Sequence, residues 1–156
     1  MVAKAEDVAP VHVESAAIAF LAMREHSRFE LRRKLARQFR DETLVGAVLD
    51  DLETRNLLSD QRFAETYVDQ RSRKGFGPLR IRAELSERGV GSDLIAELLD
   101  ERAFEWRDSL REAASRKFGD APASDRRELA RRSRFLQQRG FPTGLIGRYL
   151  DDHGLS

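Results

Sequence analysis

Residues 60–90 read DQRFAETYVDQRSRKGFGPLRIRAELSERGV and hold two helical patterns separated by a tight break. The first pattern has apolar residues at helical spacing: Phe63, Ala64, Tyr67 and Val68. Gly75 and Gly77 end it, and Pro78 suits the first turn of the helix that follows. We therefore expect two helices joined by a short turn, and we expect any working surface of the chain to be centred on this stretch.

The stretch is the central copy of an internal repeat. Aligning Leu35, Leu85 and Leu136, at spacings of 50 and then 51 residues, brings further apolar positions into register. The matched sets are Leu44, Leu94 and Leu145; Val45, Ile95 and Ile146; and Leu49, Leu99 and Leu150. Each repeat then has an acidic pair: Asp50-Asp51, Asp100-Glu101 and Asp151-Asp152. Such a period predicts stacked supersecondary units, so we expect an all-α fold of three tandem three-helix repeats in an elongated, curved body.

Helix start and stop signals divide the chain. Ser27 and Glu30 predict a capping box, and Asn56 predicts a left-handed helix stop. Either Ser59 or Asp60 is expected to cap the helix after it. The predicted boundaries are a poorly ordered tail over residues 1–14 and repeats over residues 15–58, 59–102 and 103–153.

The composition limits the classes of protein that the chain can represent. It has 156 residues, of which 40% are hydrophobic and 35% charged, with a net charge of +1 and no cysteine. Disulfides and thiolate metal sites are thereby excluded. The apolar run over residues 16–23 is too short for a membrane span, and we expect a cytoplasmic protein.

Charge alternates with the repeat. The predicted middle helices, over residues 24–40, 71–88 and 126–139, are strongly basic, whereas residues 41–60 and 93–112 are mainly acidic. Neighbouring helices that neutralise one another would explain any single band. Three basic helices in equivalent positions would also form a continuous cationic track, which suits a phosphate backbone or an acidic protein groove.

Residues typical of catalysis or metal binding are not arranged for either. His12, His26 and His153 are dispersed, and no pair of carboxylates stands out as acid and base. The glycine-rich break over residues 74–78 lacks the spacing of a phosphate-binding loop and lies between helices. The sequence therefore predicts no enzyme, no metal and no cofactor.

Several motifs together resemble the RecX family of bacterial recombinase modulators. They are residues 57–64 (LLSDQRFA) with Tyr67 and Arg71, the GFGP break over residues 75–78, residues 81–85, and Arg88-Gly89. The segment Ala22-Met23-Arg24 with Ser27, Glu30-Leu31 and Lys34-Leu35 is similar to the opening motif of that family. The resemblance spans about residues 15–152 and is strongest over 57–89; Asn56 departs from it, since the family tends to have glycine there.

The resemblance implies a protein that binds the RecA–DNA filament and restrains its ATPase, strand-exchange and co-protease activities without catalysis of its own. Motif positions carried over from the family are Arg24, Lys34, Arg62, Arg71, Gly75, Gly77, Pro78, Ile81, Leu85 and Arg88. The candidates for contact with the filament or DNA are Arg24, Arg28, Arg32, Arg33, Lys34, Arg71, Arg73, Lys74, Arg80, Arg82 and Arg88. The residues expected to set chain direction or fill the core are Phe63, Tyr67, Gly75, Gly77, Pro78, Ile81 and Leu85.

Three interpretations stay open at this point. The first is a monomeric regulator that lies in the groove of a RecA filament, with single- or double-stranded DNA as a further partner along the basic track. The second is a DNA-binding protein that acts without RecA through helix-turn-helix-like units. The third is a structural adaptor whose charge bands mediate self-association.

Overall fold

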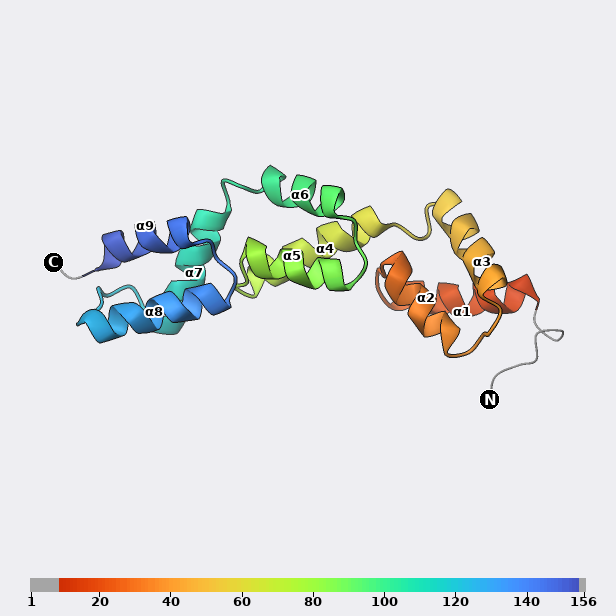
Figure 1. Ribbon diagram of the computed structural model, residues 1–156, viewed down its shortest axis with the longest axis horizontal. Coiled ribbons are helices and arrows are strands. Elements are labelled where there is room, and N and C mark those ends of the chain that lie inside the picture. Colours follow the sequence, from red (N-terminus) through yellow and green to blue (C-terminus); the bar gives the residue numbers. More distant parts are fainter. Residues whose placement is uncertain (1–8, 155–156) are drawn as a thin grey trace. The chain divides into compact units, whose positions relative to one another are not determined.

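The computed structural model describes residues 9–154, which form nine helices and no strand (Figure 1). In chain order the helices are α1 (Pro10–Met23), α2 (Arg28–Ala36), α3 (Glu42–Thr54), α4 (Asp60–Arg73), α5 (Pro78–Glu87), α6 (Ser92–Glu101), α7 (Trp106–Phe118), α8 (Arg126–Gln138) and α9 (Thr143–His153). The predicted all-α fold is therefore confirmed for the described residues.

The chain divides into two compact units. The first takes in the chain up to Thr66 together with the turn Glu87–Gly91, and the second takes in Tyr67–Ser86 and the chain from Ser92 onward. In the first unit α1, α2 and α3 pack on one another, and in the second α7, α8 and α9 do so. The segments of α4 and α5 that belong to the second unit are joined by a salt bridge between Arg71 and Glu84.

The leucines that define the repeat register are core residues. Leu35, Leu85 and Leu136 are all fully buried. The core of the first unit consists of Val13, Ala17, Leu31, Leu35, Val45, Val48, Leu49, Leu52 and Leu58. A core cluster of the second unit consists of Leu110, Ala113, Ala114, Leu136, Phe141, Ile146 and Tyr149. The apolar stripes of the sequence therefore point inward, because each helix has only one face to bury.

Helix α1 begins earlier than the sequence predicts. The predicted tail over residues 1–14 is wrong from Pro10 onward, because Pro10 opens the helix and Val13 is completely buried against the first core. Proline is well suited to this first position, where its missing N–H is not needed. Residues 1–8 lie outside the described residues, and the predicted repeat boundaries stay predictions.

The helix punctuation follows the sequence signals. The Ser27 hydroxyl accepts a hydrogen bond from the Glu30 N–H at 3.1 Å, and the Glu30 carboxylate accepts one from the Ser27 N–H at 3.2 Å. The Ser59 hydroxyl accepts from the Arg62 N–H at 3.1 Å, so Ser59 caps α4. Asn56 has a φ of 58°, the left-handed conformation expected of it after α3.

The third repeat has an arginine, Arg132, at a core position where the first and second repeats have an aliphatic residue. Arg132 corresponds to Leu31 and Ile81 in the repeat register, yet it is only 2% exposed. Its guanidinium donates to the Tyr149 hydroxyl at 3.1 Å and to the Glu128 carboxylate at 3.0 Å. Arg132 falls within the basic band predicted over residues 126–139, but it is a core residue and is not accessible to a partner.

Candidate functional site

Several of the predicted contact cations are engaged in ion pairs within the chain. Arg28 is held by Asp50 at 2.7 Å and by Glu53, and Arg24 pairs with Glu30 at 3.3 Å. Arg62 is bonded to Glu25 and Asn56, each at 2.9 Å. These side chains join neighbouring segments of the first unit, so they are less available to a partner than the sequence suggested.

Arg71 has a structural role in the second unit. Its guanidinium makes two hydrogen bonds to Glu84, at 2.9 and 2.8 Å, and lies 3.8 Å from the centroid of the Phe76 ring. Burial alone would raise the pKa of Glu84, but the hydrogen bonds and charge of Arg71, with the Tyr67 hydroxyl, outweigh it and lower that pKa. Arg80 lies over the same Phe76 ring at 4.4 Å. Arg71 therefore stabilises the turn between α4 and α5.

Other predicted contact cations are exposed. Arg32, Lys74 and Arg82 lie on the surface, and Arg73, with 78% of its side chain exposed, pairs loosely with Asp69 at 3.1 Å. Phe63, Ile81 and Leu85 are buried in the interior, and Tyr67 is half-buried. The sequence therefore distinguished core residues from surface cations, but not exposed cations from engaged ones.

A basic hollow is present in the first unit, between α2 and the end of α5. We call it the first hollow; it is lined by Phe29, Glu30, Arg33, Lys34, Arg37, Glu87 and Arg88. Arg33 is exposed on α2 and Arg37 is exposed directly after its last residue, and the Arg33 guanidinium lies 5.7 Å from the centroid of the Phe29 ring. These two arginines are its most accessible cations among the residues described.

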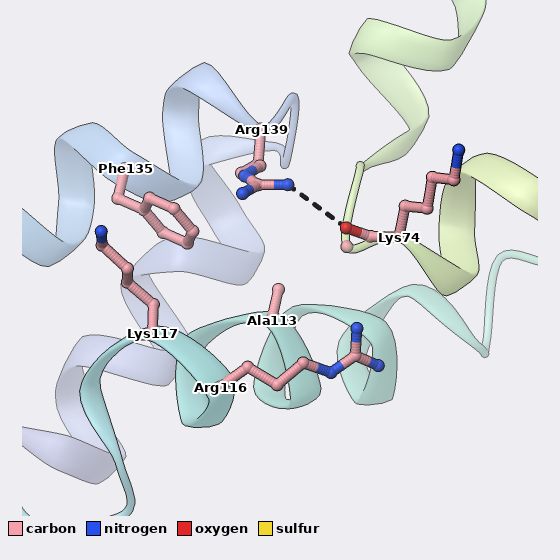
Figure 2. A pocket seen from close by; sticks show the side chains of 7 residues that line it. Lys74, Ala113, Arg116, Lys117, Phe135 and Arg139 are labelled. Atoms are coloured by element: carbon pink, nitrogen blue, oxygen red, sulfur yellow. Dashed lines mark hydrogen bonds between the residues drawn. The ribbon is translucent and has the colours of Figure 1, made fainter.

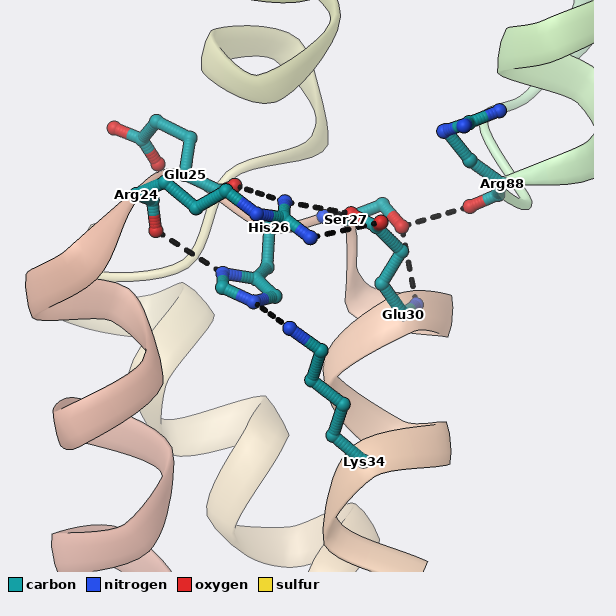
Figure 3. Close-up of polar contacts among 7 residues, drawn as sticks. All are labelled: Arg24, Glu25, His26, Ser27, Glu30, Lys34 and Arg88. Carbon is teal, nitrogen blue, oxygen red and sulfur yellow. Dashed lines mark hydrogen bonds and ion pairs between the residues drawn. The ribbon is translucent and has the colours of Figure 1, made fainter.

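The position of Lys34 in this hollow is fixed by a buried histidine (Figure 3). His26 Nδ1 lies 3.0 Å from the Arg24 carbonyl, and Lys34 Nζ lies 2.8 Å from His26 Nε2. Because a carbonyl can only accept, Nδ1 carries the ring proton and Nε2 accepts from the lysine, so the ring is neutral. Burial lowers the pKa of His26, the Arg24 carbonyl opposes this, and the charges of Arg24 and Lys34 lower it further.

A second basic hollow is present in the second unit. This second hollow is lined by Lys74, Gly75, Ala113, Arg116, Lys117, Phe135 and Arg139 (Figure 2). Arg116 donates to the Arg73 carbonyl at 3.0 Å, and Arg139 donates to the Lys74 carbonyl at 3.2 Å. Arg139 and Lys117 both lie over the Phe135 ring, 4.9 and 5.8 Å from its centroid. None of the residues that line this hollow is acidic.

Apart from Arg88 and Arg139, the residues that line the two hollows do not correspond when the chain is shifted by one repeat. The second-repeat positions that match the three cations of α2 in the first hollow hold one small and two acidic residues: Ala83, Glu84 and Glu87. The second-repeat positions that match Arg116 and Lys117 hold Glu65 and Thr66. The basic track was predicted from cations at equivalent positions, and its continuity stays a prediction.

A corresponding pair of junctions lies beside the hollows. In the first unit, the Ser27 hydroxyl donates to the Arg88 carbonyl at 2.7 Å. In the second unit, the Gly77 N–H donates to the Arg139 carbonyl at the same distance of 2.7 Å. Ser27 and Gly77 match in the repeat register, as do Arg88 and Arg139. In each case the turn that ends one repeat's middle helix contacts the start of the preceding repeat's middle helix.

Arg116, Lys117 and Arg139 were absent from the candidates chosen from the sequence. A signal for Arg139 was present, because Arg139-Gly140 corresponds to the Arg88-Gly89 motif at the spacing of 51 residues. Arg116 and Lys117 follow the apolar face of α7 and have no counterpart cation in the second repeat, so the repeat could not point to them.

No metal or membrane feature adds to these surfaces. Within residues 9–154, no group of three His, Cys, Asp or Glu side chains is placed to hold a metal ion. In the same part of the chain, no helix is both long and apolar enough to cross a membrane. Fold and surface together define a tandem-repeat protein of three three-helix domains with basic hollows suited to binding.

The chain belongs to the RecX family. Residues 15–52, 59–99 and 105–150 match the first, second and third three-helix domains of RecX. The regulatory protein RecX of Pseudomonas savastanoi pv. phaseolicola is 44% identical over 145 residues, which cover 93% of this chain and 94% of that protein. The regulatory protein RecX of Pseudomonas putida (strain GB-1) is 40% identical over 146 residues, 94% of each chain.

Solved structures show the same fold. The crystal structure of RecX from Lactobacillus salivarius matches with a TM-score of 0.75 and 20% identity, over 92% of this chain and 95% of that one. A crystal structure of regulatory protein RecX matches with a TM-score of 0.73 and 22% identity, over 91% of this chain and 71% of that one. The prediction of three tandem three-helix domains is confirmed by these matches, and the family is one of regulatory proteins.

Proposed function

We propose that this chain binds the RecA–DNA filament and lowers its ATPase, strand-exchange and co-protease activities. Its membership of a family of regulatory proteins supports this proposal. The observation that carries it further is the first hollow, where Arg33 of α2 and Arg37 just after α2 are exposed beside the fixed ammonium of Lys34. A partner surface with acidic groups would complement this arrangement.

The proposed action is binding without catalysis. The chain would lie in the groove of the filament as a cytoplasmic monomer without a cofactor, and it would contact several protomers. Each three-helix domain adds a weak contact, and tethering the domains in one chain raises the effective concentration of each. A chain seated in this way restrains the filament because the filament must change conformation as it hydrolyses ATP and exchanges strands.

The test is ATP hydrolysis by RecA on single-stranded DNA, measured against increasing amounts of the chain. Replacing both Arg33 and Arg37 with alanine should raise the amount needed for half-inhibition by about tenfold, the effect of losing about 1.4 kcal/mol of binding free energy. Neither arginine has an ion-pair partner among the residues described, so the fold should persist. Arg71 is a poor choice for this test, because removing it would take two guanidinium hydrogen bonds from Glu84 and disturb the turn between α4 and α5.

The matched control removes two exposed arginines that line neither hollow, Arg126 of α8 and Arg148 of α9. This pair of alanine substitutions should leave inhibition within twofold of the wild type. Equal inhibition by both double variants would reject the first hollow as the contact surface. A wild-type chain that leaves ATP hydrolysis unchanged would reject the proposed function itself.

A further inference from the structure

The outer face of α1 lacks Asp, Glu, Lys and Arg. The inner face packs on α2 and α3 through Val13 and Ala17, which are completely buried. The only side chain of those four types in α1 is Glu14, which is half-buried and pairs with Arg55 at the end of α3. The residues of α1 that stay exposed are Val11, His12, Ser15, Ile18, Ala19, Ala22 and Met23. A chain that is 35% charged therefore leaves one outer helix face without these residue types.

Four residues along this face have the spacing of a helix-packing seam. Val11, Ser15, Ile18 and Ala22 follow one another at intervals of four, three and four residues. This is the spacing at which one helix packs along another. Val11 is 58% exposed and Ile18 is 40% exposed, although both are large and apolar. Single apolar residues at a surface need no explanation, but a row of them at this spacing marks an interaction surface.

The seam is complementary to itself when two copies of α1 run antiparallel. With a twofold axis between Ala16 and Ala17, Val11 of one copy lies opposite Ala22 of the other, and Ser15 lies opposite Ile18. Each larger side chain then faces a smaller one, so the two helices can interlock closely. A parallel arrangement would instead place each residue opposite its own copy, which leaves gaps at the small ones.

Electrostatics favour the same arrangement. Glu14 of one copy lies opposite Ala19 of the other, so the two Glu14 carboxylates do not face each other. Antiparallel helices also place each N-terminus beside a C-terminus, which the helix dipoles favour. A twofold interface needs a surface that matches itself in both size and charge. A second copy of this chain is therefore the partner that the face fits.

We propose that the outer face of α1 is a self-association site, at which two copies of the chain form an antiparallel, twofold-symmetric dimer. A helix of 14 residues is about 21 Å long, so one of its faces buries far less than the roughly 800 Å² per partner of a stable interface. We therefore expect a weak dimer, with a dissociation constant of about 10 to 100 μM. The proposal does not rest on the proposed function, and at about 1 μM or below the chain would still be mainly monomeric.

The test is sedimentation equilibrium of the full chain over about 5 to 500 μM, a range that brackets the expected constant. Ile18→Glu places an unpaired carboxylate in the seam and should raise the dissociation constant by at least about tenfold. Val11→Glu should act in the same way, and it keeps the test valid if Ile18→Glu unfolds, because a carboxylate in the first turn stabilises a helix. Phe104→Glu is the matched control: Phe104 is 77% exposed outside α1, and the variant should stay within about twofold of the wild type.

Two results of this experiment would overturn the proposal. The first is a wild-type chain that stays monomeric at about 500 μM, whether residues 1–8 or a different protein cover the face. The second is equal weakening by Phe104→Glu, because association would then not depend on α1. Ile18→Glu should inhibit ATP hydrolysis by RecA as well as the wild type does. Lost inhibition, in a chain whose wild type does not self-associate, would assign the face to the filament instead.

The absence of cysteine from the chain allows the orientation to be tested directly. Val11→Cys mixed with Ala22→Cys should form an intermolecular disulfide on mild oxidation, because the antiparallel dimer brings the two positions within the Cα separation of about 6 Å that a disulfide needs. Val11→Cys alone should not cross-link, since its two copies lie about 16 Å apart along the helices. Cross-linking of Val11→Cys alone, with none added by the mixture, would overturn the antiparallel arrangement.

Discussion

The junction in the first unit and the junction in the second unit are built from corresponding residues but closed by different chemistry. At the first junction the side-chain hydroxyl of Ser27 holds the Arg88 carbonyl. At the second, backbone N–H groups of Gly77 and Leu79 hold the carbonyls of Arg139 and Gly140, at 2.7 and 2.9 Å. A hydrogen bond between backbone groups requires the two backbone segments to approach more closely than a hydrogen bond from a side chain does.

Glycine makes that approach possible. A Cβ on Gly140 would lie 2.5 Å from the Arg80 backbone nitrogen, and a Cβ on Gly77 would lie 2.6 Å from the Gly140 carbonyl oxygen. At the first junction, a Cβ on Gly89 would lie 2.4 Å from Phe29 Cβ, a side-chain atom. The junction between successive domains therefore lies at the same repeat positions in both units, while the residues at each junction determine how closely its two backbone segments pack.

The largest predicted effect on stability comes from adding a side chain at the second junction. Gly140→Ala must place a methyl group against the backbone of Arg80 at a φ of 94°, so we expect a loss of about 3 kcal/mol in the free energy of unfolding. Urea denaturation would measure it. Gly144→Ala is the matched control, since nothing lies within 4 Å of the added Cβ, and it should be neutral or stabilising.

The same substitution at the first junction sharpens the comparison. Gly89→Ala, at a φ of 78°, should cost less than Gly140→Ala, because the three atoms nearest to its added Cβ all belong to the Phe29 side chain, whereas the Arg80 backbone N and Cα are among the nearest at Gly140. Equal losses at the two positions would contradict the view that the second junction is the more rigid.

A smaller effect is expected from the side-chain bond of the first junction. Ser27→Ala removes the hydroxyl that binds the Arg88 carbonyl and caps α2, and Ser27 is fully buried, so we expect a loss of about 1 to 2 kcal/mol. Ser109→Ala provides the control, because its hydroxyl donates locally, to the carbonyl of Glu105 at the start of α7, at 3.1 Å. A Ser27 variant as stable as the Ser109 variant would show that the hydroxyl does not hold this junction.

The smallest predicted effect is a dependence on pH in the first unit. The folded-state pKa of His26 is lowered from 6.5, chiefly by burial, so the unfolded chain takes up its proton first as pH falls. Above pH 6.5 His26 is neutral in both the folded and the unfolded chain and costs no stability. As pH falls below 6.5 toward the folded-state pKa, the free energy of unfolding declines. Denaturation midpoints at pH 7.5 and 5.5 would measure the decline, and His26→Gln should reduce it; an unchanged difference between the two pH values would reject the role of His26.

The sequence predicted the core and the helix ends well because both depend on local pattern. Leu35, Leu85 and Leu136 could be aligned from spacing alone, and all are fully buried. Asn56 adopts the left-handed conformation that its side chain tolerates. The start of α1 is the exception, because the tail predicted over residues 1–14 overlaps a helix that begins at Pro10.

The availability of the cations could not be predicted in the same way. Whether an arginine is exposed depends on a carboxylate that only the fold brings to it, as with Arg71 and Glu84 on different helices. Arg132 shows most clearly why exposure is hard to predict from sequence. Its position in the repeat matches an aliphatic core residue and predicts burial, whereas its charged side chain predicts exposure, and it is buried. Its burial depends on Tyr149, a residue of a different helix.

ATP hydrolysis by RecA on single-stranded DNA tests the central claim most directly. We predict that the wild-type chain lowers the hydrolysis rate as its concentration rises, and that the variant lacking Arg33 and Arg37 needs about ten times more for the same inhibition. A rate that stays constant at every concentration of the wild-type chain would contradict the account.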